Sequence, residues 1–349
     1  MQADQRATTL GGLANSYAVA AFLSLGRPQV AIDFGTANLR IVRRAEGVVF
    51  DEPSLCCFKR GPGKPSLYAA GLEAAAMVDR APSHLQVKRP LVRGVLQDID
   101  VARDLLKYAV QRAYRRQSVR RPGVIMGVPA DATQAERAAL VTAAEDAGLG
   151  AVTLVAEPLA AAHGAEVAID APAGAMVVEC GAGTTEAAVL SLGGICVSRS
   201  VRLGGADLDA AMADHLHSAH RFLVGDLTAE RIKHDYVARR TGGADGPLKI
   251  RGRSLKTGFP GSIDIEAAEL DPLVERHAMR IVALIQETLE ATPPELSHDI
   301  HGRGIILTGG GATMPMILGM VEGMIGVSAK IADEPAHCVA KGLQRLLVH

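Results

Sequence analysis

The sequence has few aromatic residues and lacks the patterns that build disulfides or common metal centres. Among its 349 residues there is no tryptophan, and aromatic residues make up only 3%. The 5 cysteines show no CxxC spacing, and the 11 histidines form no HExxH pair. We therefore expect small buried cysteines in a reducing compartment, and no metal ion held wholly by side chains.

Charge and hydrophobicity argue against a nucleic-acid-binding protein and against a membrane-spanning protein. The formal net charge is -1, so no general basic field would attract nucleic acid. The basic run of residues 112–121 is typical of a solvated helix end, and a polyanion or lipid patch stays open as the alternative. No apolar run is long enough to span a bilayer. Residues 10–25 are apolar but do not share one helical face, which leaves open a loose extension or a membrane-touching helix.

The sequence also lacks the common nucleotide-binding and nucleophile motifs. It contains no GxxxxGK[ST] motif, which argues against a P-loop protein. No GxGxxG follows the first predicted strand, which argues against a dinucleotide-binding fold. No strand-to-helix elbow surrounds a serine or a cysteine, so a covalent hydrolase mechanism is not indicated.

Strands alternate with helices along the chain, which predicts an α/β fold. Residues 124–128 have the apolar pattern of a buried strand. Residues 133–148 then predict an alanine-rich helix, in which Thr133 is the N-cap and Glu136 completes a capping box. Gly148 is placed to end that helix.

An internal repeat is the most informative feature of the sequence. Residues 30–36 and 177–184 each contain a buried strand, an acid at its end, a glycine two residues later and small hydroxylated residues, and a second strand follows. The two acids are Asp33 and Glu179. A hairpin duplicated in this way, one copy in each half of the chain, predicts two related lobes that face each other.

A third turn is rich in glycine. It follows a predicted strand in residues 305–313 and opens a helix expected at 314–324. Taken singly, such a turn is more often a plain β-turn than a phosphate cradle. Three of them in this order favour a polyphosphate ligand, because backbone N–H groups of tight turns bind phosphate oxygens. The acids of the two hairpins would then hold a divalent cation, usually through its water molecules.

Longer stretches of the sequence resemble the MreB family of bacterial actins, in the superfamily of actin, sugar kinases and heat-shock chaperones. The resemblance runs from about Val30 to the C-terminus. Its most specific strings are LTAERIKHD (227–235) and IRGRSLKTGFP (250–260), which are not expected in sugar kinases or chaperones. Further strings are AIDFGTANLRIV (31–42), VPADATQAER (128–137), AEPLAAAHGA (156–165), GAGTTEAAVLSLGG (181–194) and LTGGGATM (307–314).

The resemblance implies an actin-like α/β fold with two lobes, each with a mixed central sheet, and a nucleotide in the cleft between them. The divisions it implies are an N-terminal extension (1–28), a first lobe (29–174) with an inserted subdomain at about 53–94, a second lobe (175–337) with an inserted subdomain at about 206–268, and a last helix (338–349) that returns to the first lobe.

Carried over residue by residue, the resemblance implies that the three turns bind ATP and Mg²⁺. Asp33 and Glu179 would hold Mg²⁺ through water, and Glu179 would also act in catalysis. Glu136 would position the attacking water, in addition to its place in the capping box. The other nucleotide contacts are expected from the first hairpin (Gly35, Thr36, Ala37, Asn38), the second hairpin (Gly181, Ala182, Gly183, Thr184, Thr185), the phosphate end (Gly204, Gly205), the ribose pair (Glu230, Lys233) and the adenosine turn (Gly309, Gly310, Gly311).

Two residues of the second hairpin depart from the family pattern. Glu179 stands where the family usually has aspartate, and Ala182 stands where it has glycine. The longer acid could displace Mg²⁺ or its water, and the added methyl group could strain a turn that needs an unusual φ. We therefore expect the chain to bind ATP but to hydrolyse it slowly.

The function implied by the resemblance is ATP-dependent polymerisation of the chain with itself. The filaments would lie at the inner face of the cytoplasmic membrane, where they guide cell-wall synthesis together with shape proteins. The chain would then be cytoplasmic and peripheral to the membrane, and whether it is an ATPase stays open. Two alternatives stay open as well, namely a phosphotransferase of the same superfamily and a non-hydrolysing actin-like scaffold for an organelle or a septum.

Overall fold

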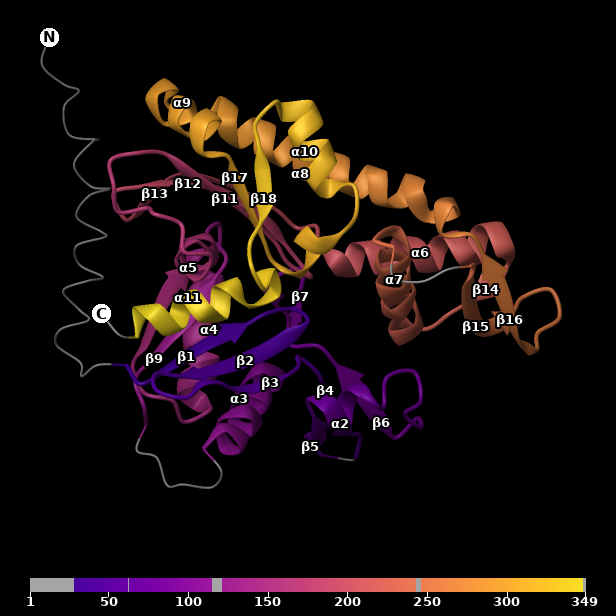
Figure 1. Ribbon diagram of the computed structural model, residues 1–349. Coiled ribbons are helices and arrows are strands. Elements are labelled where there is room, and N and C mark those ends of the chain that lie inside the picture. The colour runs from indigo at the N-terminus through magenta and orange to yellow at the C-terminus, as the bar shows by residue number, and fades with distance from the viewer. Residues whose placement is uncertain (1–27, 62, 115–120, 243–245, 348–349) are drawn as a thin grey trace, which may run out of the picture.

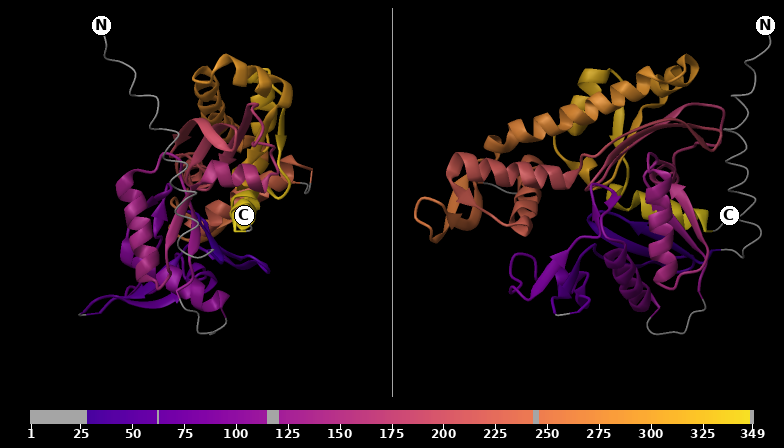
Figure 2. Two further views of the ribbon diagram at one scale, coloured as in Figure 1. Left: turned by 90° about the vertical axis from the view of Figure 1, so that its left-hand side faces the viewer. Right: turned by 180° about the vertical axis from the view of Figure 1, so that it is seen from behind.

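The computed structural model describes residues 28–61, 63–114, 121–242 and 246–347. Two lobes lie one above the other in Figure 1, and each is built on a five-stranded sheet. Each lobe also carries a smaller sheet, and both smaller sheets lie on the same side of the molecule (Figures 1 and 2). The predicted α/β fold with two lobes is confirmed.

The first sheet contains the first hairpin and has the strand order β10-β9-β1-β2-β3. Strand β1 pairs antiparallel with β2 and parallel with β9, so the sheet is mixed. Val30 and Ile32 of β1 share a buried cluster with helices α3 and α4, whereas Ala31 faces a different cluster on the other side. The elements of this lobe are β1 (Val30–Phe34), β2 (Asn38–Arg43), β3 (Gly47–Pro53), α3 (Ile99–Ala113), β9 (Val124–Val128), α4 (Gln134–Asp146), β10 (Val152–Ala156) and α5 (Glu157–Gly164).

The second sheet contains the second hairpin and has the strand order β13-β12-β11-β17-β18. Strand β11 pairs antiparallel with β12 and parallel with β17, which repeats the pairing of β1. Met176 and Val178 of β11 share a buried cluster with helix α8, whereas Val177 faces the other side. The elements of this lobe are β11 (Ala175–Cys180), β12 (Thr185–Ser191), β13 (Gly194–Val201), α8 (Asp271–Glu290), α9 (Pro294–Arg303), β17 (Ile305–Thr308), η2 (Gly310–Thr313), α10 (Ile317–Ile325), β18 (Ala329–Ile331) and η3 (Pro335–His337).

One buried cluster joins the two lobes. It contains Ala31 of the first sheet and Val177 of the second sheet, together with side chains of α5 and of the last helix, α11 (Cys338–Leu346). Helix α11 packs on α5 and on β1 and β2 of the first lobe, and Figure 1 shows it between the two sheets. After the last strand of the second lobe, the chain therefore returns to the first lobe and ends there in helix α11.

Helices α5 and α11 touch through their backbones. A Cβ atom placed on Gly164 would overlap the carbonyl oxygen of Cys338, and one placed on Gly342 would overlap that of Ala160. Only glycine leaves room for this contact, since any other residue adds an atom where the facing backbone already lies.

The smaller sheets and one short hairpin complete the described fold. The two three-stranded sheets lie within the spans 53–94 and 206–268 that the sequence suggests for insertions, and the lobe boundaries themselves stay a prediction. The elements are β4 (Cys56–Lys59), β5 (Ser66–Ala70), α2 (Leu72–Ala75), β6 (Leu85–Lys88), β7 (Leu91–Val92), β8 (Val95–Leu96), α6 (Gly205–His220), β14 (Phe222–Leu223), α7 (Asp226–Arg240), β15 (Leu248–Ser254), β16 (Pro260–Ile265) and η1 (Ala267–Leu270).

The predicted start of the last long helix of the second lobe is wrong. We expected it at Met314, but Met314 is extended and α10 begins at Ile317. The reason lies in Pro315, because a residue before proline is disfavoured in the helical region. Met316 then has a φ of 79°, which delays the helix further.

Within the described ranges, no helix is both long and apolar enough to cross a membrane. The apolar segment 10–25 lies outside those ranges, as does most of the basic run 112–121. The expectations for these two segments are therefore carried only by their sequence.

Candidate nucleotide-binding site

The two hairpin turns share one hydrogen-bonding pattern. The Gly35 N–H donates to the carbonyl oxygen of Asn38 at 3.0 Å, and the Gly181 N–H donates to that of Thr184 at 2.8 Å. Both turns line the same cavity between the lobes, as the internal repeat predicts. The predicted site residues that line this cavity are Asp33, Gly35, Thr36, Ala37, Asn38, Glu136, Glu179, Gly181, Ala182, Gly183, Thr184, Gly309 and Gly310.

The third turn packs against the second hairpin. Gly309 has a φ of 81°, and its N–H donates to the carbonyl oxygen of Pro335 at 2.8 Å. A Cβ atom at Gly309 would overlap the carbonyl group of Cys180. Glycine is therefore required here both for its backbone conformation and for the close approach of the two turns.

In the first hairpin the acid faces an arginine. Asp33 and Arg40 are partners in the β1–β2 register, and Arg40 Nη1 lies 3.0 Å from Asp33 Oδ2. Arg40 also donates from Nε to Asp51 Oδ2 at 3.1 Å. Burial raises the pKa of Asp33, and the charge of Arg40 opposes that rise. The first hairpin thus presents a buried acid with a counter-ion.

In the second hairpin the same two positions are both acids. Glu179 pairs with Glu186 in the β11–β12 register. Burial, followed by the charge of Glu186, raises the pKa of Glu179 well above its usual value, and burial raises the pKa of Glu186 to about 7. Glu186 Oε1 accepts from the Ala130 N–H at 2.8 Å, but its buried Oε2 has no hydrogen-bond partner. The second hairpin therefore presents two facing buried acids where the first presents an acid and an arginine.

Glu157 adds another buried carboxyl group. It is the first residue of α5 and lines the cavity. Burial, followed by the charges of Glu186 and Glu179, raises its pKa well above the usual value. Carboxyl groups that repel one another in this way are stabilised by a cation, and oxygen donors suit a hard divalent ion. The residues present therefore fit Mg²⁺.

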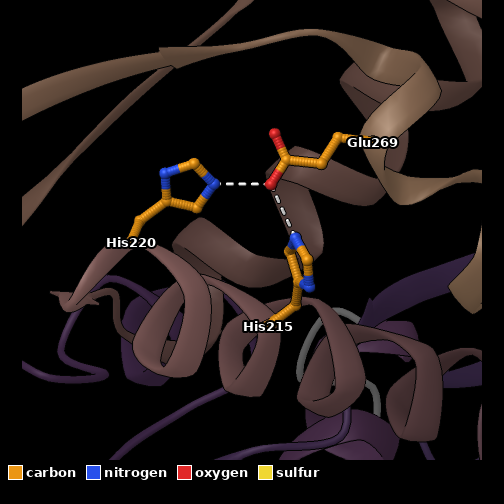
Figure 3. Close-up of side chains that lie close together, drawn as sticks. All are labelled: His215, His220 and Glu269. Carbon is orange, nitrogen blue, oxygen red and sulfur yellow. Dashed lines mark hydrogen bonds and ion pairs between the residues drawn. The ribbon is translucent and has the colours of Figure 1, made fainter.

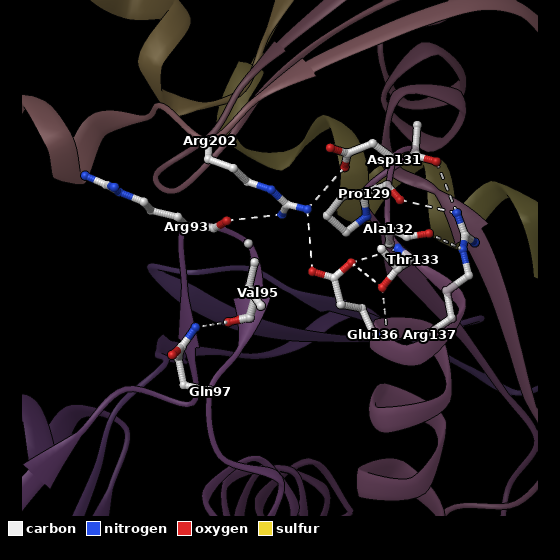
Figure 4. A network of polar contacts seen from close by, with 12 residues as sticks. Arg93, Val95, Gln97, Pro129, Asp131, Ala132, Thr133, Glu136, Arg137 and Arg202 are labelled. Carbon is white, nitrogen blue, oxygen red and sulfur yellow. Dashed lines mark hydrogen bonds and ion pairs between the residues drawn. The ribbon is translucent and has the colours of Figure 1, made fainter.

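Glu136 reaches the cavity from the first turn of α4. Its Oε2 accepts from the N–H and the hydroxyl of Thr133, at 2.7 and 2.9 Å, and the predicted capping box is confirmed. Its Oε1 lies 3.6 Å from Nη2 of Arg202 (Figure 4). The backbone hydrogen bond at Thr133 lowers the pKa of Glu136, so the group is ionised at neutral pH. Its role in positioning water stays a prediction.

The short β7–β8 hairpin connects the lobes beside the cavity. Arg93 Nη2 lies 2.6 Å from Oδ1 of Asp207 in α6, and the Gly94 N–H donates to the hydroxyl of Thr36 at 3.2 Å. Arg202 donates to the carbonyl oxygen of Arg93 at 3.2 Å (Figure 4). Both turn residues are left-handed, with φ of 50° at Arg93 and 71° at Gly94, as in a type I′ turn. Contacts from both lobes hold this strained turn in place.

The remaining predicted site residues do not line the cavity, and they are Thr185, Gly204, Gly205, Gly311, Glu230 and Lys233. Gly205 still touches the second turn, because its N–H donates to the carbonyl oxygen of Gly181 at 3.1 Å. Lys233 Nζ lies 2.8 Å from Asp209 and donates to the carbonyl oxygen of Gly205 at 3.2 Å. Lys233 is therefore engaged with α6, and the ribose role of this residue and of Glu230 stays a prediction.

The strain expected at Ala182 is absent. Ala182 has no positive φ, so its methyl group meets no conformational penalty. Its carbonyl oxygen accepts from the Ala206 N–H at 2.9 Å, which ties the second turn to the start of α6. The backbone conformation at this position does not require the family's glycine, and our expectation of an unusual φ is wrong.

Several residues of the site were not identified from the sequence, namely Arg40, Arg93, Glu157, Glu186 and Arg202. Pairing the strands of the second hairpin would have placed Glu186 opposite Glu179. The contact between Arg202 and Arg93 joins residues 109 positions apart, so no local sequence pattern predicts it.

Two lobes on mixed sheets, which hold one cavity between equivalent hairpin turns, define the class of actin-like nucleotide-binding proteins. The family model for MreB/Mbl protein matches residues 27–349. The cell shape-determining protein MreB of Escherichia coli (strain K12) is 36% identical over 316 residues, which cover 90% of this chain and 91% of that protein. The chain belongs to the MreB/Mbl family of actin-like proteins.

Solved structures agree with this assignment. The crystal structure of MreB5 of Spiroplasma citri bound to ADP has a TM-score of 0.85 and 32% identity, covering 92% of this chain and 96% of that one. A structure of the same protein bound to AMPPNP has a TM-score of 0.84. A MamK double helical filament, at 22% identity and a TM-score of 0.74, covers 92% of this chain and 98% of that one and shows the fold alone.

Proposed function

We propose that this chain binds ATP with Mg²⁺ in the cavity between its lobes and polymerises with itself into filaments that set cell shape. The observation that carries the proposal is the pair of equivalent hairpin turns facing one cavity. Tight turns rich in glycine suit a polyphosphate, because their backbone N–H groups can bind phosphate oxygens. The related MreB5 was solved with ADP and with AMPPNP, which supports an adenine nucleotide as the ligand here.

Asp33 and Glu179 would hold the Mg²⁺, since they stand at equivalent ends of the two hairpins. The ion would supply positive charge for the phosphate oxygens. The raised pKa values of Glu179 and Glu157 support this assignment, because a nearby cation would offset the burial, and after it the repulsion between acids, that raise them. Glu157, which lines the same cavity, would add a third carboxyl group near the ion.

Hydrolysis would depend on Glu136. Its carboxylate is ionised and fixed by Thr133, so it can accept a hydrogen bond from a water and orient that water toward a phosphate. No covalent intermediate is needed. Turnover would be slow, because Glu179 is one methylene longer than the aspartate of the family pattern and a shift of about 1 Å at a catalytic group can cost roughly a hundredfold in rate.

The filaments would lie at the inner face of the cytoplasmic membrane and organise cell-wall synthesis with its partner proteins. The similarity to the cell shape-determining protein MreB of E. coli supports this role. The MamK filament supports the idea that subunits of this fold can be arranged lengthwise.

Sedimentation of the purified full-length chain tests the assembly. We expect pelleting above a critical concentration with Mg²⁺ and ATP, and little without nucleotide. A chain that stays monomeric at every concentration, with ATP and anionic lipid present, would overturn the proposal. Efficient transfer of the γ-phosphate of labelled ATP to a small acceptor would instead favour a phosphotransferase. Pelleting with no phosphate release would favour the non-hydrolysing scaffold.

Membrane attachment is tested separately by co-sedimentation with liposomes. If residues 10–25 bind lipid, a chain that lacks residues 1–26 should lose co-sedimentation and keep its ATP affinity. Equal lipid binding by both chains would exclude this segment and would point to the region 53–94.

A further inference from the structure

Two histidines and a glutamate converge at one point of the second lobe, away from the nucleotide cavity (Figure 3). His215 and His220 lie near the C-terminal end of α6, and Glu269 lies in η1. Nε2 of His215 lies 2.7 Å from Glu269 Oε1, and Nε2 of His220 lies 2.5 Å from the same oxygen. All three ligand atoms lie within 4.8 Å of one another.

We propose that His215, His220 and Glu269 form a binding site for Zn²⁺. Imidazole nitrogen together with carboxylate oxygen is a ligand set that zinc accepts, whereas Mg²⁺ and Ca²⁺ prefer oxygen alone. Three protein ligands with an open fourth position are a common zinc arrangement. The side chains are 24%, 29% and 34% exposed, which leaves access for an ion and for a water as the fourth ligand.

The geometry needs little adjustment to accept the ion. Zinc bonds of about 2.0–2.1 Å in a tetrahedron separate the ligand atoms by about 3.3 Å. The two nitrogen-to-oxygen distances of 2.7 and 2.5 Å would therefore lengthen by less than about 1 Å, within reach of small side-chain rotations. The imidazole rings cross at 69° with centroids 6.0 Å apart, so neither ring blocks the other from the shared point.

In Figure 3 the hydrogen bonds of this cluster converge on one carboxylate oxygen and leave the other oxygen without a histidine partner. Both histidines point one ring nitrogen at a single oxygen of Glu269, while the second oxygen points away from both rings. An ion between the three atoms would bind all of them at once. We expected no metal held by side chains, because the sequence spacing lacks a known metal motif. The glutamate, however, is 54 and 49 residues from the two histidines, and only the fold brings them together.

A zinc ion here would link α6 to η1, which leads directly into α8. The opposite end of α6 begins at Gly205, which donates a hydrogen bond to the second hairpin turn. The site would therefore fix the far end of a helix whose first residue is hydrogen-bonded to a turn that lines the nucleotide cavity.

Titration of the full-length, chelator-treated chain with Zn²⁺ alone tests the proposal by calorimetry. We expect one ion per chain, and an increase in the midpoint of thermal unfolding, because a ligand that binds the folded state stabilises it. His215→Asn, His220→Asn and Glu269→Gln should each weaken Zn²⁺ binding by roughly tenfold or more. The matched control is His217→Asn, since His217 is exposed on the same helix and outside the cluster.

The proposal is overturned if the wild type binds no Zn²⁺, or if His215→Asn and His217→Asn bind it equally well. Circular dichroism shows which variants fold, and Glu269→Gln, which keeps the size of the side chain and an acceptor oxygen, carries the test if a histidine variant does not. ATP affinity should stay unchanged in all variants, which separates this site from the nucleotide cavity.

Discussion

Glu186 is the residue at which the second hairpin differs most in charge from the first hairpin. Its partner across the strands is the acid Glu179, whereas the corresponding pair in the first hairpin is Asp33 and Arg40. Its Oε2 is buried without a partner, and burial raises its pKa from 4.5 to about 7. Between pH 4.5 and about pH 7, Glu186 therefore holds a proton in the folded protein that it has released in the unfolded chain. The contribution of Glu186 to stability is therefore present at low pH and is lost as the pH rises through about 7.

Glu186→Gln should stabilise the protein without nucleotide or metal at neutral and higher pH. The amide keeps an oxygen for the Ala130 N–H and removes the buried charge, so the free energy of unfolding should rise by up to about 3 kcal/mol above pH 7. The gain should shrink toward zero below about pH 4.5, where glutamate is protonated in both states. Urea unfolding of both proteins across this pH range measures it. A gain that does not change with pH would contradict the pKa argument.

Glu136 has two separable roles that two substitutions distinguish. Glu136→Ala removes the capping box, which should lower the free energy of unfolding by about 1 kcal/mol, and removes the carboxylate that faces the cavity. Glu136→Gln keeps an oxygen for Thr133 and should keep the stability. Both variants should lose phosphate release in single-turnover measurements and keep ATP affinity. Wild-type hydrolysis by Glu136→Gln would show that the carboxylate does not orient the water.

Glu179→Asp tests the reach of the second acid. Shortening the side chain should bring the site closer to the family pattern and speed phosphate release, by up to roughly a hundredfold. The measurement is single-turnover release at matched filament mass for the variant and the wild type. If the variant is no faster, the site is adapted to glutamate and the argument from side-chain length is wrong. Ala182 has no positive φ, so the glutamate is the main remaining departure from the family pattern in this hairpin.

At the scale of elements, the contact of α5 with α11 depends on two glycines. Gly342→Ala would place a methyl group on the carbonyl oxygen of Ala160, and the helices would have to move apart. We expect a loss of about 3 kcal/mol in the free energy of unfolding. Gly319→Ala is the matched control, because Gly319 lies inside α10 with nothing near its Cβ position and should gain up to about 1 kcal/mol. Equal effects of the two substitutions in urea unfolding would contradict the packing described here.

Elements that depend on local sequence were predictable. The duplicated hairpins and the capping box of α4 follow from acids, glycines and caps that lie within a few residues of one another. The start of α10 was missed because the glycine turn was weighed above Pro315, although the restriction before a proline is also local. The contact between η1 and the end of α6 could not be predicted from the sequence, because it depends on how elements distant in the sequence pack together.

At the scale of the whole molecule, the repeat and the family strings predicted two lobes around one cavity, and the structure agrees. The contacts that close the lobes on each other were not predictable. Arg93 meets Asp207 114 residues away, and Arg202 meets Arg93 109 residues away. Such pairs follow from the relative position of the lobes, which no single segment encodes.

The central claim is that one nucleotide is shared by the two hairpins, and isothermal calorimetry with ATP tests it most directly. With Mg²⁺ the wild type should bind one ATP per chain. Asp33→Asn and Glu179→Gln, one substitution in each hairpin, should each weaken binding with Mg²⁺ by roughly tenfold or more and have a much smaller effect with EDTA. The absence of ATP binding, or a loss confined to the variant of one hairpin, would contradict a site held between both lobes.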